Sequence, residues 1–145
     1  MSRPTDASMD PHGGDPEFRR LVDVVTAGGQ RFGHRRHVQL AWLAVRHYGG
    51  AEAATERLTA WLRQVTAAAG RPKKYHYTVS RAWVELVAHH VARPYDDFES
   101  FAAAHPQLLD KRLLGRHYSS AVLASEAART GWVEPDVRPF PWSDR

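Results

Sequence analysis

The chain of 145 residues contains no cysteine, which excludes disulfide bonds, thiolate catalysis and thiolate metal sites. No apolar run approaches the roughly 20 residues that a membrane-spanning helix needs. The first residues, MSRPTDASMDPHGGDP, lack the apolar centre of a signal peptide. Together these absences predict a cytoplasmic protein. No segment shows the alternating pattern of a convincing strand, so we expect no sheet.

Histidine, in contrast, is unusually frequent, with nine copies in the chain. A hydrophobic content of 43% predicts a packed globular protein, and the length suits one domain. The net charge is +4, but most basic residues are arginines scattered among acidic ones. Because no nucleic-acid-binding motif accompanies them, an anionic small molecule is a better candidate partner than nucleic acid.

Glycine and proline divide the chain into helical segments with apolar residues at helical spacing. Residues 1–16 should form a disordered tail, and residues 17–145 a single helical domain. We expect the main helices at about 16–27, 34–48, 51–70, 74–93 and 96–105. Short helices should follow within 107–130, and then an extended proline-rich tail. The fold class is therefore all-α, a single compact helical bundle.

The segment FGHRRH opens the second helix and places His34 and His37 on one helix face. The segment KYHYT opens the fourth helix with Tyr75, His76 and Tyr77. Short loops make sequential helices antiparallel neighbours, so the second and fourth helices should be parallel, with their first residues at the same end. The sequence therefore predicts that these histidines and tyrosines meet.

This end of the bundle should attract anions, because helix N-termini carry partial positive charge. His34, His37 and His76 would be the catalytic residues, with Tyr75 or Tyr77 as a proton donor or orienting group. Further along the same helices, the residues predicted to bind substrate are Arg35, Trp42, Ser80 and Trp83.

Neutral imidazoles also bind metals, so His34, His37 and His76 could hold a divalent transition metal such as Zn, Fe or Cu. The alternative is that all of them hydrogen-bond to the backbone and the tyrosines. The zinc motif HExxH does not occur. His117, followed by Tyr118, is a lesser candidate for a functional residue.

The strings FGHRRHVQLAWL, KYHYTVSRAW and LLGRHYSSAVLASEAARTGWVEPDVRPFP resemble an uncharacterised family of small helical bacterial proteins. The resemblance covers about residues 17–141. It implies an all-helical domain and a role for His34, His37 and His76. Where the family pattern has glutamate, this chain has Tyr77, which weakens a site of two histidines and a carboxylate. Asp136 could supply a replacement carboxylate if the tail folds back.

Two functions follow as alternatives. The first is a small enzyme of bacterial metabolism, specialised metabolism included: a lyase, isomerase or hydrolase that acts on an anionic small molecule by proton transfer. The second is a non-catalytic binding module for an acidic metabolite or an acidic protein partner. Nucleic-acid binding ranks below both because only net charge supports it. For the oligomeric state, a monomer and a homodimer are both open.

Overall fold

The structure, a computed structural model, describes residues 15–29, 32–91 and 95–143. Every regular element in these residues is a helix, which confirms the predicted all-α fold. None of the described helices is both long and apolar enough to span a bilayer. The α-helices are α2 (Pro16–Val25), α3 (His34–Tyr48), α4 (Ala51–Ala68), α5 (Tyr77–His90), α6 (Phe98–Ala104), α7 (Ser120–Leu123) and α8 (Glu126–Thr130). Short 3₁₀ turns occupy Ala27–Gly29, Pro72–Lys74, Pro106–Leu109, Lys111–Arg116 and Pro141–Ser143.

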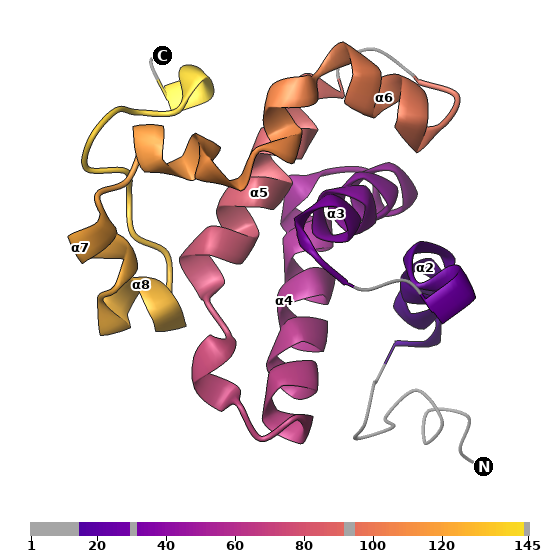
Figure 1. Ribbon diagram of the computed structural model, residues 1–145, viewed down its shortest axis with the longest axis horizontal. Helices are drawn as coiled ribbons and strands as arrows, with labels where there is room; N and C mark the ends of the chain where they lie inside the picture. Colours follow the sequence, from indigo (N-terminus) through magenta and orange to yellow (C-terminus); the bar gives the residue numbers. More distant parts are fainter. Residues whose placement is uncertain (1–14, 30–31, 92–94, 144–145) are drawn as a thin grey trace.

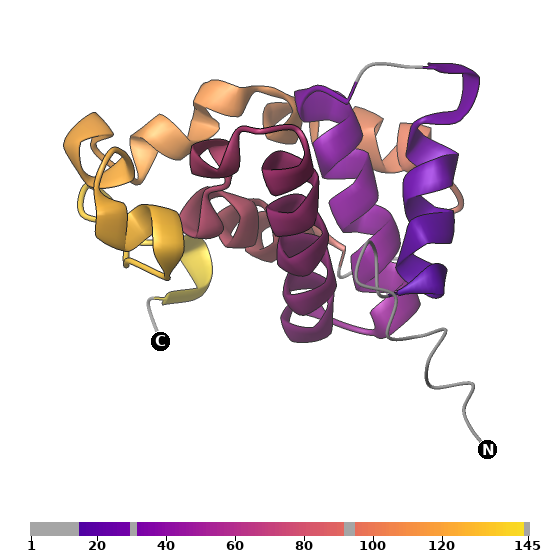
Figure 2. The ribbon, with the colours of Figure 1, turned by 90° about the horizontal axis from the view of Figure 1, so that it is seen from below.

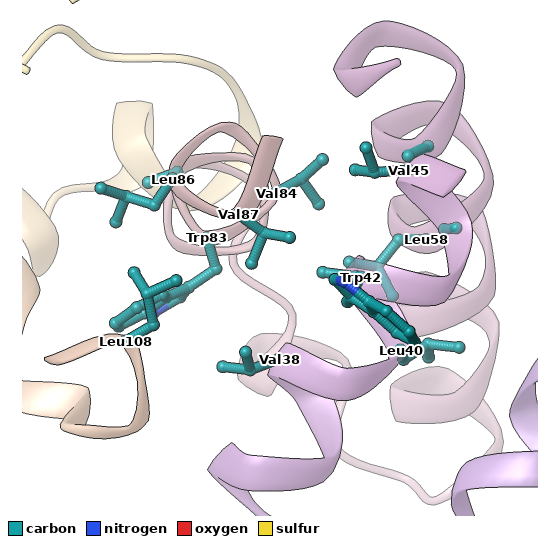
Figure 3. Packing of buried hydrophobic residues seen from close by; sticks show 14 of the residues in the cluster. Val38, Leu40, Trp42, Val45, Leu58, Trp83, Val84, Leu86, Val87 and Leu108 are labelled. Atoms are coloured by element: carbon teal, nitrogen blue, oxygen red, sulfur yellow. The ribbon is translucent and has the colours of Figure 1, made fainter. Parts of the chain in front are cut away.

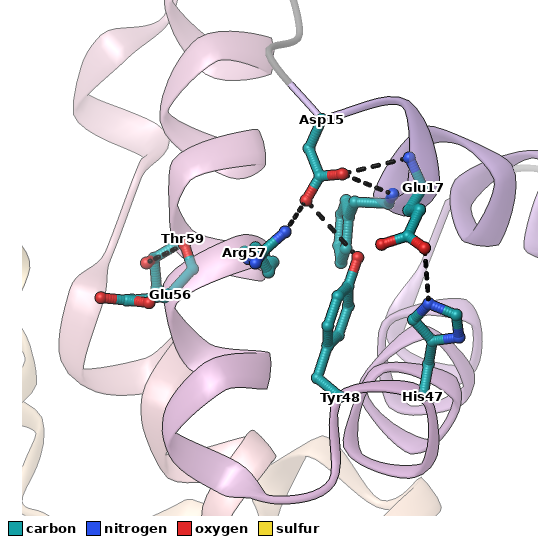
Figure 4. Close-up of polar contacts among 8 residues, drawn as sticks. Asp15, Glu17, His47, Tyr48, Glu56, Arg57 and Thr59 are labelled. Atoms are coloured by element: carbon teal, nitrogen blue, oxygen red, sulfur yellow. Dashed lines mark hydrogen bonds and ion pairs between the residues drawn. The ribbon is translucent and has the colours of Figure 1, made fainter. Parts of the chain in front are cut away.

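Asp15 begins the described chain and fixes the start of α2. Its Oδ1 accepts the backbone N–H groups of Glu17 and Phe18 at 3.1 and 3.2 Å, as an N-cap residue does. Its Oδ2 pairs with the Arg57 guanidinium of α4 (Figure 4). The predicted tail at residues 1–14 lies outside the described residues, whereas Asp15 and Pro16 belong to α2 and its cap.

The centre of the molecule is formed by α3, α4 and α5, which pack on one another (Figures 1 and 2). The predicted bounds of α3 are confirmed. Gly49 ends α3 with φ 83°, a left-handed conformation that glycine adopts without steric cost. Figure 3 shows the core between these helices, where α3 residues such as Val38 and Trp42 face Val84 and Val87 of α5.

The angle between α3 and α5 differs from the sequence-based expectation. In Figure 1, α3 is seen almost end-on, whereas α4 and α5 run in the plane of the page. α3 therefore crosses α5 steeply, and the prediction of parallel helices is wrong. A short loop makes two helices neighbours, but the crossing angle depends on how their side-chain ridges interlock.

α7, α8 and the segment that follows them cover the side of α5 that faces away from α2 (Figures 1 and 2). The Thr78 hydroxyl donates to the carbonyl of Gly131 at 2.6 Å and accepts the N–H of Val133 at 3.1 Å. Phe140 is the anchor of the proline-rich tail, since only 1% of its surface is exposed. The tail therefore runs along α5 from Thr78 at its start to His89 near its end, where the Trp142 ring lies 5.2 Å from the imidazole.

Candidate functional site

His34 lies at the first position of α3 and contacts the middle of α5. Its imidazole meets the Trp83 indole edge-on, with ring centroids 4.4 Å apart. Its Nε2 donates to the main-chain carbonyl of Leu108 at 2.9 Å. Burial lowers the pKa of His34, although the hydrogen bond to Leu108 opposes this shift. One ring nitrogen is therefore committed to the backbone.

His37 lies one turn further along α3 and is close enough to His34 to interact with it electrostatically. Burial, with a smaller contribution from His34, lowers the pKa of His37 to about 4. Its Nε2 is buried without a hydrogen-bond partner among the described residues. The Phe32 ring stacks on the imidazole, with centroids 6.0 Å apart. The side chain is consequently neutral at neutral pH.

His76 does not join this pair. It is the N-cap residue of α5, and its Nδ1 accepts the N–H of Val79 at 3.1 Å. Its Nε2 donates to the carbonyl of Leu123 at 2.7 Å. Trp83, which His34 contacts, lies seven residues further along the chain, a rise of about 10 Å along a helix. Both nitrogens of His76 are used in holding the fold.

These positions bear on the predicted Zn, Fe or Cu site. No group of at least three His, Asp or Glu side chains within the described ranges is arranged to hold a metal ion. For His76 to bind a metal, its bonds to Val79 and Leu123 would have to break. Asp136, the candidate replacement carboxylate, instead accepts the N–H of Ser119 at 2.8 Å. The geometry gives the three-histidine metal site no support.

The two candidate tyrosines lie in different environments. Tyr75 is buried, its hydroxyl has no hydrogen-bond partner among the described residues, and the Arg63 guanidinium lies 5.3 Å from its ring centre. Tyr77 lines a cleft of about 530 Å³ between α4 and α5, together with Glu52 and Glu56 among others. An acidic cleft of this kind does not suit an anionic substrate.

The predicted substrate-binding residues also have separate structural roles. Arg35 pairs with Glu99 at 2.6 Å, and Ser80 donates its hydroxyl to the His76 carbonyl at 2.8 Å. Trp83 is a core residue with 2% exposure. Trp42 is buried too, but its edge lines a cavity of about 300 Å³ with Arg46 and other residues. These side chains therefore take part in separate contacts of the fold.

A basic pocket of about 470 Å³ lies instead between α5 and the C-terminal segments. We call it the basic pocket and define it by its lining residues: Leu86, His90, Gln107, Leu113, Arg116, His117, Arg138, Pro139 and Pro141. The lining includes two arginines and two histidines but no acidic residue. Its volume falls within the usual range for small-molecule sites.

The two arginines of the basic pocket form no ion pair with any described carboxylate. Asp110 is close enough to interact electrostatically with Arg116, but it is hydrogen-bonded to Arg112 at 3.0 Å. The pKa of Asp110 is lowered mainly by those hydrogen bonds from Arg112 and less by the charge of Arg116. Arg116 and Arg138 thus bring positive charge to the pocket without a bonded counter-ion.

The histidines of the basic pocket are oriented by backbone carbonyls. His117 is 8% exposed, and its Nδ1 donates to the Arg138 carbonyl at 2.9 Å. His90 donates its Nδ1–H to the carbonyl of Leu86 at 2.8 Å. In a neutral ring the second nitrogen, Nε2, then carries the acceptor lone pair. Each imidazole is therefore held in one orientation before any ligand arrives.

Sequence reasoning identified only His117 of this group, as a lesser candidate. Arg116 directly precedes His117, so the string GRHY carried a weak signal. Arg138 is separated from Arg116 by more than 20 positions, and only the folding of the tail brings them to one pocket. His90 lies in the last turn of α5, where a basic side chain is favoured by the helix dipole, so its position in the sequence does not by itself indicate a binding residue.

Comparison of the chain with protein-family models, curated proteins and solved structures gives no match. The resemblance to a family of small bacterial helical proteins therefore stays a prediction. The functional argument rests on the geometry of the histidine pair and of the basic pocket.

Proposed function

We propose that the protein binds an anionic small molecule in the basic pocket, as a binding module rather than through the predicted histidine triad. The observation that carries the proposal is the lining: Arg116 and Arg138 bring positive charge to one cavity that no carboxylate lines. Guanidinium groups bind carboxylates and phosphates through paired N–H donors. An anion in this cavity would supply the partner that both groups lack.

The strength of anion binding depends on how far the side chains of the pocket are exposed to solvent. Both arginines are exposed residues, so salt should screen their attraction for an anion. His117 is buried and held by a carbonyl, so it loses little side-chain freedom on binding. We therefore expect moderate affinity that falls as the salt concentration rises.

The experiment is an NMR titration of the full-length protein with sodium octanoate and with inorganic phosphate at constant ionic strength. We expect backbone amide shifts in residues 107–118 and 137–141. The variants Arg116→Gln and Arg138→Gln should each weaken binding of the anion about tenfold, the effect of losing one charge-assisted hydrogen bond.

Lys111→Gln is the matched control. Lys111 lies in the same 3₁₀ turn as Arg116 and is exposed. Its loss should change the affinity by less than about twofold, because it does not line the pocket. If neither anion shifts these amides, or if all three variants bind equally, the proposal is wrong.

Proton-transfer catalysis at His34 and His37 is the second candidate function. It is favoured by the buried, unpartnered Nε2 of His37, since orphan polar groups are found at catalytic sites. However, a pKa of about 4 for His37 makes its imidazole a weak base at neutral pH. For this reason we place anion binding first.

A further inference from the structure

We infer that the ligand of the basic pocket is amphipathic, an organic anion with an apolar tail or ring, rather than a small inorganic ion. This inference rests on the proposed anion-binding function. The pocket combines polar and apolar side chains in each of its walls, and its volume of about 470 Å³ exceeds what a bare phosphate or acetate needs.

The α5 wall pairs an apolar residue with an imidazole. Leu86 and His90 lie four residues apart in α5, so both side chains are on one face of the helix. The hydrogen bond from His90 Nδ1 to the Leu86 carbonyl keeps the ring against that face. A ligand in the pocket therefore meets an apolar side chain and an imidazole on the same side.

The second wall repeats this combination in the 3₁₀ turn Lys111–Arg116. Residues three apart in a 3₁₀ helix are eclipsed, so Leu113 and Arg116 project in nearly the same direction. Both line the basic pocket. A charged headgroup held by Arg116 would place its attached carbon chain beside Leu113.

The tail forms the third wall, where Arg138 precedes Pro139 and Pro141. Proline has a fixed φ and no backbone N–H, so both residues present apolar rings without adding a donor. Phe140 between them is buried, with its ring 4.5 Å from that of His117. The apolar part of this wall is therefore held in place before the ligand binds.

Selectivity follows from this arrangement. Arginines alone would bind any anion of similar charge, whereas an apolar tail adds affinity for each methylene that it buries. Burying about three methylenes against Leu86, Leu113 and the prolines should improve affinity about thirtyfold or more. The expected ligand class is thus a hydrophobic carboxylate or phosphate ester.

The test compares four probes by calorimetry with the wild-type protein at pH 7.5 and constant ionic strength: octanoate, acetate, inorganic phosphate and 1-octanol. We expect octanoate to bind at least about thirtyfold more tightly than acetate or phosphate. Octanoate should also bind at least about tenfold more tightly than 1-octanol, which has the chain but no charge.

Two variants test whether Leu113 contacts the apolar chain of octanoate. Leu113→Ser should weaken octanoate about fivefold to tenfold and leave acetate within twofold, because it removes apolar wall but no charge. Leu109→Ser is the matched control, since Leu109 is a half-buried leucine of the preceding 3₁₀ turn that does not line the pocket. The wild-type comparison does not depend on whether either variant folds.

The outcomes separate the two proposals. If acetate or phosphate binds as tightly as octanoate, and Arg116→Gln weakens both, the inference is wrong while anion binding stands. If 1-octanol binds as tightly as octanoate and the arginine variants have no effect, both proposals are wrong. If none of the anions binds, the proposed function itself fails.

Discussion

His117 and Arg138 are joined by hydrogen bonds in both directions. His117 donates its Nδ1–H to the Arg138 carbonyl at 2.9 Å, and the His117 carbonyl accepts the N–H of Arg138 at 3.4 Å and that of Val137 at 2.8 Å. These bonds join the end of the 3₁₀ turn Lys111–Arg116 to the proline-rich tail. Because these bonds help to hold Arg138 beside the pocket, binding and the packing of the tail should be coupled.

The variant Phe140→Ala tests that coupling. Phe140 is 1% exposed and packs against His117 and Trp142. Removing a buried phenyl ring should lower the free energy of unfolding by about 3–5 kcal/mol and weaken octanoate binding, because Arg138 loses its fixed position. Urea denaturation and calorimetry measure these effects. If the tail is destabilised but octanoate binds unchanged, Arg138 is not part of the binding site.

His76 should behave as a structural residue. His76→Ala removes the cap of α5 and the bond to Leu123, so we expect a loss of about 2 kcal/mol in the free energy of unfolding. His76→Asn should recover roughly 1 kcal/mol of this, because asparagine is a good N-cap. Thermal denaturation provides the measurement. Failure of asparagine to recover stability, together with loss of ligand binding, would indicate a functional role.

Helix boundaries were predictable where a single residue determines them. α3 begins and ends at His34 and Tyr48, as predicted, because Gly33 and Gly49 flank it. α5 begins at Tyr77 rather than Lys74, because the side chain of His76 itself caps the helix. Helix propensity cannot reveal where α5 begins, since the cap requires the Nδ1 atom of His76 to bond to a particular N–H.

The candidate site was less predictable than the fold. The spacing of His34 and His37 correctly placed them together on α3. Their expected meeting with His76 required a crossing angle that depends on side-chain packing between helices. The basic pocket depends on contacts such as Phe140 on His117, over 20 residues apart. Sequence periodicity carries no information about such pairs.

The contact of Asp15 with Arg57 should stabilise the attachment of α2 to α4 (Figure 4). Burial alone would raise the pKa of Asp15, but Arg57 and the N–H groups of Phe18 and Glu17 lower it below its usual value. Asp15→Ala should lower the free energy of unfolding by about 1–2 kcal/mol. Asp15→Asn keeps a cap but not the charge, and should lower it by less than about 1 kcal/mol. If chemical denaturation shows that both variants lose the same free energy of unfolding, the effect comes from the charge of Asp15 alone.

His37 should make stability depend on pH in the acidic range. Its pKa in the folded protein is about 4, whereas an unfolded histidine has a pKa of about 6.5. As the pH falls below about 6.5, the unfolded chain takes up the proton first, so the folded state loses stability until about pH 4. The loss from this residue should reach at most about 3 kcal/mol, and urea denaturation from pH 7.5 to 4 measures it.

His37→Leu should remove most of that dependence, since leucine does not titrate. The lowered pKa values of His34 and His105 act in the same direction, so some pH dependence should persist in the variant. His47→Leu is the matched control, because His47 lies on the same helix but is exposed to solvent. If both variants follow the wild-type pH curve equally, His37 is protonated in the folded protein at its ordinary pKa, and its neutral, buried state is refuted.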